Sequence, residues 1–309
     1  MKFAFLPLVF MLGVHWSWSQ NVAEKLGYPP DTKLLIIHAD DLGVTHSENA
    51  ASIVGMTEGC VNSGSIMVPC PWFMEIAKTA AANPAMDIGV HLTLTSEWAT
   101  FKWGPVAGQS KVPSLVDRNG YFFDNVPEVA EKGDAMEVKV ELTYQINMAL
   151  ANHIEVTHLD THMGALLANK GFLKSYLEIG NQFQLPVLVS KELPRIEDPE
   201  IVALLQAGNQ VVADRVIGAS PRDFESGMDT FYKTVLTNLE PGFTVLLIHL
   251  AYDDAEMQAV TIDHPNWGAA WRQADLDFFK SAQCADLLAE NKVVLLQWRE
   301  IRDKIIRAK

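Results

Sequence analysis

Cysteine is scarce in this sequence, and positive charge is neither abundant nor clustered. The 309 residues include three cysteines, Cys60, Cys70 and Cys284, and none lies in a CxxC metal or redox motif. Cys60 and Cys70 are candidates for a disulfide in an oxidising compartment, and buried free thiols are an equal alternative. The net charge of −14, without a lysine or arginine cluster, argues against binding to nucleic acid or anionic lipid, because both require a positive patch.

Several common catalytic motifs are also absent. The sequence has no G-x-S-x-G elbow, P-loop, H-E-x-x-H helix or dinucleotide-binding glycine run. Nucleophilic catalysis by serine or cysteine is therefore unsupported. The acidic composition fits a neutral or cationic small substrate better than an anionic one, and amino sugars satisfy that condition.

The N-terminus has the layout of a secretory signal peptide. Lys2 precedes an apolar run over Phe3–Val14, and a polar and aromatic stretch continues to Gln20. The apolar run is too short to span a bilayer as a helix. We expect cleavage after Ser19 or Gln20, a secreted or periplasmic protein, and no membrane span afterwards; an uncleaved membrane anchor is the alternative.

From residue 33 onward, short β-type runs alternate with longer helical patterns. This alternation predicts an α/β fold: a single barrel-like β/α domain over residues 21–309, closed or nearly closed, with seven or eight parallel strands. The predicted strands are residues 34–38, 64–68, 87–92, 154–159, 186–190, 210–213, 244–249 and 293–297, and the predicted helices include 47–57, 72–82, 137–153 and 171–182.

Two stretches break this rhythm. Residues 97–134 are rich in glycine, proline and aromatic residues and are too long for an ordinary connection. Residues 251–270 form a second interruption. We expect the first to be an elaborated loop or lid beside the functional site.

Most of the polar residues with catalytic or metal-binding chemistry follow the predicted strands. In β/α barrels the carboxyl ends of the strands carry the active site, and core histidines have no reason to gather there. The residues at these ends are Asp40, Asp41, His91, His158, Asp160, His162 and His249.

His158, Asp160 and His162 are spaced by two, so on an extended segment they project from one face. Three convergent polar side chains in a buried strand indicate metal coordination or proton transfer, because their burial must otherwise be offset by hydrogen bonds. A structural hydrogen-bond network is the alternative. Within a metal site, Asp160 is best placed to orient an imidazole.

Asp40 and Asp41 lie between the first strand and the first long helix. Adjacent carboxylates there either cap the helix or divide into a metal ligand and a general base. His91 and His249 each lie at the end of an apolar β run, where a satisfied core histidine is the alternative to a functional one.

Three segments resemble the motif regions of a known family. They are HADDLG at the first strand, GVHLTLT at residues 89–95 and THLDTHMG at residues 157–164. Their order and spacing resemble the YdjC-like carbohydrate deacetylases, which act on N-acetylated chito-oligosaccharides, and the similarity extends over residues 33–303. The resemblance implies a barrel related to polysaccharide deacetylases and a divalent metal, with Mg²⁺ and Zn²⁺ the leading candidates.

Carried over by motif position, the resemblance makes Asp41, His91 and His158 the metal ligands and Asp40 the general base. The ion is expected to polarise an acetamide carbonyl and activate a water, from which Asp40 takes a proton. His249, or else His162, then protonates the departing amine. The family usually has a His-Pro-Gly turn late in the chain, where this sequence reads His249-Leu-Ala.

Four residues near the strand ends or in the interruptions are candidates for substrate contacts. Aromatic faces stack on sugar rings, although core or loop packing is the alternative for each tryptophan. Arg272, with Asp275, begins the last long helical pattern, where a solvated helix face is the alternative. The candidates are Trp72, Trp103, Trp267 and Arg272.

Two other functions fit parts of the pattern. His158-x-Asp160 with a distant His249 imitates the two-histidine, one-carboxylate set of Fe(II) oxygenases, although those sites normally lie in antiparallel folds. The changed turn after His249 allows a barrel that binds glycans without turnover. Oxygen consumption with a 2-oxo acid identifies the oxygenase, and sugar binding without acetate release identifies the glycan-binding protein.

Overall fold

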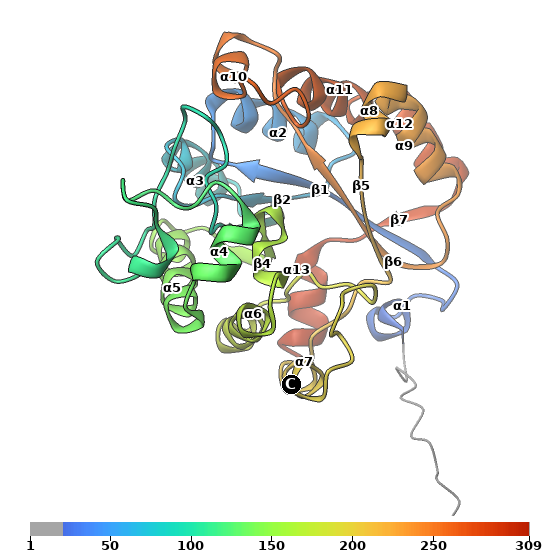
Figure 1. Cartoon of the computed structure of the whole chain (residues 1–309). Coiled ribbons are helices and arrows are strands. Elements are labelled where there is room, and N and C mark those ends of the chain that lie inside the picture. The colour runs from blue at the N-terminus through green and yellow to red at the C-terminus, as the bar shows by residue number, and fades with distance from the viewer. Residues whose placement is uncertain (1–20, 309) are drawn as a thin grey trace, which may run out of the picture.

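The structure, a computed structural model, describes residues 21–308, so the predicted signal peptide lies outside the described residues. A parallel sheet of seven strands runs through this part (Figure 1), in the order β4-β3-β2-β1-β6-β5, with β7 pairing with the first residues of β1. The predicted α/β class with a parallel sheet is confirmed. The strands are β1 (Lys33–Leu42), β2 (Ser63–Ile66), β3 (Ile88–Leu92), β4 (Val156–Thr161), β5 (Arg215–Gly218), β6 (Gly242–His249) and β7 (Val293–Leu295).

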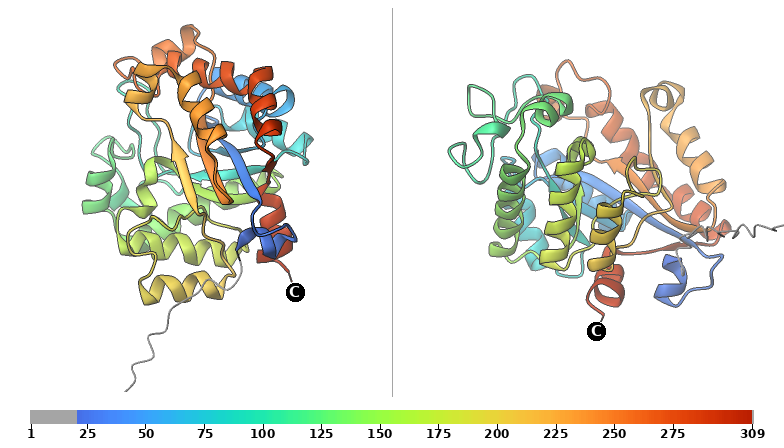
Figure 2. Two further views of the ribbon diagram at one scale, coloured as in Figure 1. Left: turned by 90° about the vertical axis from the view of Figure 1, so that its right-hand side faces the viewer. Right: turned by 60° about the horizontal axis from the view of Figure 1, so that its bottom comes forward.

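Most helices lie around the outside of this sheet, whereas the first and the last lie at one end of it (Figures 1 and 2). The four helices predicted by residue range are confirmed, with ends that differ by at most two residues. No helix in residues 21–308 combines the length and apolar character needed to cross a membrane. The helices are α1 (Val22–Leu26), α2 (His46–Glu58), α3 (Phe73–Ala82), α4 (Val126–Lys132), α5 (Ala135–Ala151), α6 (Lys170–Phe183), α7 (Pro199–Ala207), α8 (Pro221–Ser226), α9 (Met228–Thr237), α10 (Ala255–Val260), α11 (Ala269–Phe279), α12 (Ala282–Glu290) and α13 (Trp298–Ile301), with short turns η1 (Pro113–Leu115), η2 (His162–Leu167) and η3 (Arg302–Ile306).

The two faces of β1 belong to two different hydrophobic cores. Leu35 and Ile37 pack in the larger core, which includes residues of the surrounding helices, whereas Leu34 and Ile36 pack in a smaller one with Trp298. Alternation along a strand places His38 and Asp40 on the face of Leu34 and Ile36. That face is therefore apolar at the amino end of the strand and polar at its carboxyl end.

Between the edge strands β4 and β5, two irregular segments take the place of regular strands. They pair with β4 and with each other through single residues only. Val187 bridges Leu159, and Ser190 bridges Ala213. The strands predicted at 186–190 and 210–213 are therefore wrong as regular strands. The reason is that side chains take the place of ladder partners: the Gln210 side-chain oxygen accepts a hydrogen bond from the Val187 N–H.

The two interruptions contain little regular structure, as predicted. Residues 97–134 hold only η1 and α4, and residues 251–270 hold α10 followed by an irregular segment up to the start of α11. Both interruptions contribute residues to the cleft at the carboxyl end of the strands, as described next.

Candidate active site

Asp40 and Asp41 both face the cleft although they are adjacent in the chain. In a regular strand neighbouring side chains point to opposite faces. Here the β1–β2 register shifts between Ala39 and Leu42, and Asp41 has a φ of 67°, so the backbone turns and both carboxylates reach the same side. Thr45, rather than either aspartate, caps α2. The capping alternative for the aspartates is therefore not realised.

Asp41, His91 and His162 bring three donor atoms together in the interior. Asp41 Oδ1 lies 3.4 Å from His91 Nε2 and 3.2 Å from His162 Nδ1, and the two ring nitrogens are 3.2 Å apart. Ligand bonds of roughly 2.0–2.2 Å place neighbouring donors at about this spacing around one ion. Asp41 Oδ1 is buried and has no hydrogen-bond partner among the described residues. The three residues therefore fit a divalent metal.

His158, the third ligand expected from the sequence, is not part of this group. It is fully buried, its ring stacks 5.0 Å from Trp298, and it groups instead with His38 and Asp160. Strands rise about 3.3 Å per residue, so His158 lies roughly 13 Å below His162 along the chain. The structure thus brings His162 to the position expected of His158. His249 joins neither His158 nor Asp160 in these groups, so the alternative Fe(II) oxygenase set is not assembled in residues 21–308.

Each of the two grouped imidazoles has a carboxylate at its other nitrogen. His91 Nδ1 lies 2.7 Å from Asp160 Oδ2, and His162 Nε2 lies 3.0 and 3.1 Å from the two oxygens of Glu97. A carboxylate that accepts from one ring nitrogen fixes the tautomer and leaves the other nitrogen free for a metal. Asp160 thus has the orienting position expected from the sequence. Sequence reasoning missed Glu97, which no motif marked, although it follows the second motif region directly.

Burial and neighbouring groups shift the pKa of Asp41 in opposite directions. Burial disfavours its ionised form, but the Arg272 guanidinium and the two imidazoles of His162 and His91 outweigh it and hold the pKa of Asp41 well below the usual value. The carboxylate is therefore ionised over the whole neutral range, as a metal ligand must be.

His38 lies beneath the two aspartates and was not predicted as a site residue. Its Nε2 lies 3.1 Å from Asp40 Oδ1 and 3.2 Å from Asp160 Oδ2, and its Nδ1 lies 2.9 Å from Ser63 Oγ. Burial lowers its pKa, but Asp160 and Asp40 prevail and raise the pKa of His38 to about 9. The alternation of β1 was the available signal, because it places His38 on the face of Asp40.

His249 lies opposite Asp40 in the register of β1 and β6. Its Nε2 is 3.9 Å from Asp40 Oδ2 and 4.0 Å from Asp41 Oδ2, and its side chain is 21% exposed toward the cleft. Burial, together with the positive charge of Arg272, lowers the pKa of His249 to about 4. The imidazole is therefore neutral at neutral pH.

A cleft of about 820 Å³ opens above these residues. Of the four expected substrate contacts, Trp267 and Arg272 line it, and Trp267 is 41% exposed. Trp103 is buried behind the site, where its Nε1 donates to the Thr95 carbonyl and its ring lies 6.4 Å from His162. Trp72 is exposed beside His46 and does not line the cleft.

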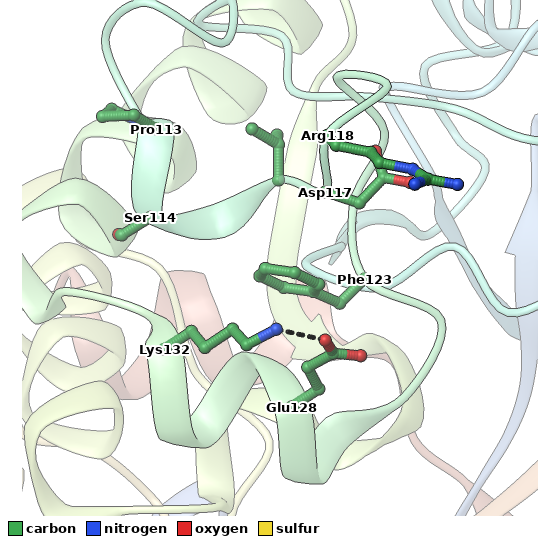
Figure 3. Close-up of a pocket in the computed structure, with 8 residues that line it drawn as sticks. Pro113, Ser114, Asp117, Arg118, Phe123, Glu128 and Lys132 are labelled. Atoms are coloured by element: carbon green, nitrogen blue, oxygen red, sulfur yellow. Dashed lines mark hydrogen bonds and ion pairs between the residues drawn. The ribbon is translucent and has the colours of Figure 1, made fainter.

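The cleft continues into two further hollows along the 97–134 segment. A hollow of about 520 Å³ shares Glu97, Asp124 and His264 with the cleft. A third, of about 490 Å³, shares Asp117, Phe123 and Glu128 with the second; Figure 3 shows it, with the Glu128–Lys132 ion pair beside the Phe123 ring. The second and third hollows, which share lining residues with each other and in one case with the cleft, are together called the groove.

Comparison with known proteins identifies the family of this chain. The profile of the YdjC-like protein family matches residues 34–290. This chain belongs to the YdjC-like family. The resemblance inferred from the three motif regions is thereby confirmed.

Two relatives named carbohydrate deacetylase align with nearly the whole chain. The one from Thermus thermophilus is 31% identical over 291 residues, which cover 92% of this chain and 99% of the relative. The one from Thermoanaerobacter pseudethanolicus is 24% identical over 275 residues, 86% of this chain and 98% of the relative. Among solved structures, an Enterococcus faecalis protein described as a cellobiose-phosphate cleavage protein has a TM-score of 0.72 at 25% identity, covering 87% of this chain and 99% of that one.

Proposed function

We propose that this protein is a metal-dependent hydrolase that removes the N-acetyl group from an amino sugar or chito-oligosaccharide. The observation that carries the proposal is the triangle of Asp41, His91 and His162 donors, with a separate carboxylate, Asp40, beside it on the cleft. Membership of the YdjC-like family and two relatives named carbohydrate deacetylase support the same chemistry.

In this proposal Asp41, His91 and His162 hold the divalent ion. Two imidazole nitrogens and one carboxylate oxygen leave positions open for water and substrate, and this donor set suits Zn²⁺, with Mg²⁺ the alternative. When bound, such an ion supplies a Lewis acid that polarises a carbonyl and lowers the pKa of a water. His162 replaces His158 in the ligand set because its Nδ1 faces both other donors.

Asp40 is the proposed general base. His38 lies against its Oδ1, whereas its Oδ2 lies on the side of His249. Oδ1 is thus buried beside His38, whereas Oδ2 is available to a water in the cleft. A carboxylate held in this way accepts the proton of the attacking water without first losing a bond to a neighbouring residue.

His249 is the proposed general acid toward the leaving amine. Because its pKa is lowered to about 4, the resting imidazole is neutral and lacks the second ring proton that a general acid would donate. The proton must therefore arrive during the reaction, and Asp40 Oδ2, 3.9 Å from His249 Nε2, is the nearest source. Asp40 and His249 act in sequence on one proton, first removed from water and then delivered to the amine.

The cleft walls fit a sugar. The exposed indole of Trp267 offers a flat apolar face, and its ring stacks on Trp271 at 5.0 Å, which keeps it from rotating freely. The groove beyond the cleft offers Tyr121, 42% exposed, to a further sugar unit. An oligosaccharide therefore suits the site better than a single sugar.

An acetate-release assay tests the proposal. Purified protein, with Zn²⁺ or Mg²⁺ or with a chelator, is incubated with N-acetylglucosamine and its β-1,4 oligomers. We expect release that the chelator abolishes, and loss of about 10²–10⁴-fold in kcat for Asp40→Asn with bound metal retained. Chelator-resistant release contradicts the metal site, and full activity of Asp40→Asn contradicts the base. Sugar binding without release identifies the glycan-binding alternative.

A further inference from the structure

Arg272 is a buried arginine whose polar contacts reach three separate segments. Its side chain is 3% exposed; Nη2 donates to Asp41 Oδ2 at 2.8 Å, Nη1 to Glu48, and Nε to the Trp267 carbonyl at 2.6 Å. Its guanidinium carbon also lies 5.6 Å from the centre of the Trp98 ring. The solvated helix face considered for Arg272 from the sequence is therefore wrong.

These partners belong to different walls of the site. Asp41 is the next-to-last residue of β1 and a proposed metal ligand, Glu48 lies on α2, and Trp98 is the second residue of the 97–134 segment. Trp267 lies in the irregular segment before α11 and lines the cleft. Planar guanidinium groups have several donors in a fixed fork, so one arginine holds these groups at fixed mutual positions, which a lysine cannot do.

The segment that carries Trp267 needs such a restraint. Asp263 has a φ of 66° and Trp267 a φ of 57°, which is an unfavourable conformation for residues with a side chain. Trp267 is also 41% exposed, and its ring stacks on Trp271. The hydrogen bond from Arg272 Nε is the described contact that ties its backbone to the metal-binding side of the cleft.

We propose that Arg272 is a positioning residue that sets the place of the Trp267 indole relative to the Asp41 carboxylate. It thereby fixes the separation between a sugar-stacking surface and the metal centre. The connection between segment 261–268 and Asp41 is inferred from the contacts of Arg272 with Trp267 and Asp41 and does not depend on the proposed function. Its consequence for sugar binding rests on the proposed function.

The first test measures amide hydrogen exchange in peptides that cover residues 261–268. Arg272→Lys keeps a positive charge near Asp41 and Glu48, but one ammonium cannot replace the three bonds of the fork. We expect exchange in this segment to rise about tenfold, corresponding to about 1.4 kcal/mol of lost protection. Arg302→Lys is the matched control, because Arg302 is also buried and paired but bonds the Val156 carbonyl and Glu155 at the other end of β4. Unchanged exchange in Arg272→Lys overturns the proposal.

The wild-type protein provides a second measurement if Arg272→Lys does not fold. A metal that restrains Asp41 also restrains Arg272, and through it Trp267. Exchange of residues 261–268 is therefore expected to be slower with Zn²⁺ bound than after chelation, whereas a peptide of α7, far from the site, does not change. Equal exchange of 261–268 in both states contradicts the link.

The third test separates positioning from general support. We expect Arg272→Lys to raise KM for N-acetylated chitobiose about tenfold while Zn²⁺ affinity stays within about threefold, because charge is retained. Trp267→Ala is expected to raise KM by a similar factor, and the double variant no further, because Arg272 acts on the sugar through Trp267. If the increases in KM of the two single variants multiply in the double variant, the proposal is overturned. If the wild type releases no acetate, the proposed function is refuted instead. The hydrogen-exchange measurements then still test whether Arg272 connects segment 261–268 to Asp41.

Discussion

Asp160 Oδ2 lies 2.7 Å from His91 Nδ1, and the two residues are register partners on the neighbouring strands β3 and β4. The same oxygen lies 3.0 Å from Ser65 Oγ and 3.2 Å from His38 Nε2. The carboxylate that orients a candidate metal ligand is therefore itself fixed from two further strands. The orientation of His91 is a property of the sheet rather than of a loop.

Removing this orientation is expected to weaken metal binding. Asp160→Asn, and separately Glu97→Gln, should lower Zn²⁺ affinity about 10–100-fold, because each carboxylate fixes the tautomer and angle of one imidazole. Titration calorimetry, or the absorption spectrum of bound Co²⁺, measures the change. Asp117→Asn is the control, since Asp117 lines the same groove but touches no imidazole. An unchanged affinity in both carboxylate variants would falsify the orienting role.

The choice between His162 and His158 as metal ligand gives a second prediction. His162→Ala should reduce bound metal to well under one ion per chain, because a donor of the triangle is lost. His158→Gln should retain about one ion, because His158 lies below the triangle against Trp298. Elemental analysis of purified, folded protein measures both. The opposite pattern would restore the ligand set expected from the motifs.

The sequence located the carboxyl ends of the correct strands but could not select between the two histidines. The spacing of His158, Asp160 and His162 correctly placed them on one face, as the strand period requires. Which of them reaches Asp41 depends on how far β4 extends before the chain turns at His162 and on the height of Asp41 in the neighbouring strand. Neither the length of β4 nor the height of Asp41 can be read from the spacing of residues along one strand.

Other residues escaped prediction because their partners are distant in sequence. Glu97 acts on His162, 65 residues away, and His38 bridges to Asp160, 122 residues away. Neither pair follows from local spacing. The strand errors have a similar cause, because side chains such as Gln210 satisfy backbone groups that a regular ladder would pair.

Asp275 gives a prediction for the pH dependence of stability. Burial raises its pKa to about 7, although it accepts hydrogen bonds from the His249 N–H and the Tyr232 hydroxyl. The folded protein therefore keeps a proton that the unfolded chain releases near its usual pKa of 3.8. This stabilisation is fully present below about pH 4 and is lost as pH rises through about 7.

Denaturant unfolding at several pH values measures this contribution. The difference in unfolding free energy between the wild type and Asp275→Asn should shift by roughly 4 kcal/mol against the wild type from pH 4 to pH 8, about three pKa units at 1.36 kcal/mol each. Comparison with the variant cancels the titration of other groups. A difference that is constant with pH, or that moves in favour of the wild type, contradicts the raised pKa.

Substrate length offers a test of the groove beyond the cleft. Tyr121 lines the second hollow, outside the cleft that holds the reacting groups, so it can contact only a sugar unit beyond the first. Tyr121→Ala should lower kcat/KM about 3–10-fold for a tri- or tetrasaccharide, as expected for one lost aromatic stacking contact, and leave the monosaccharide value unchanged. Tyr144→Ala is the matched control, because Tyr144 is 38% exposed on α5 and lines none of the three hollows.

Equal loss of kcat/KM on every chain length would mean that Tyr121 supports the fold of the 97–134 segment. No loss on any chain length would place the further sugar units elsewhere. A loss that appears only from the disaccharide upward identifies this groove as the path of the oligosaccharide.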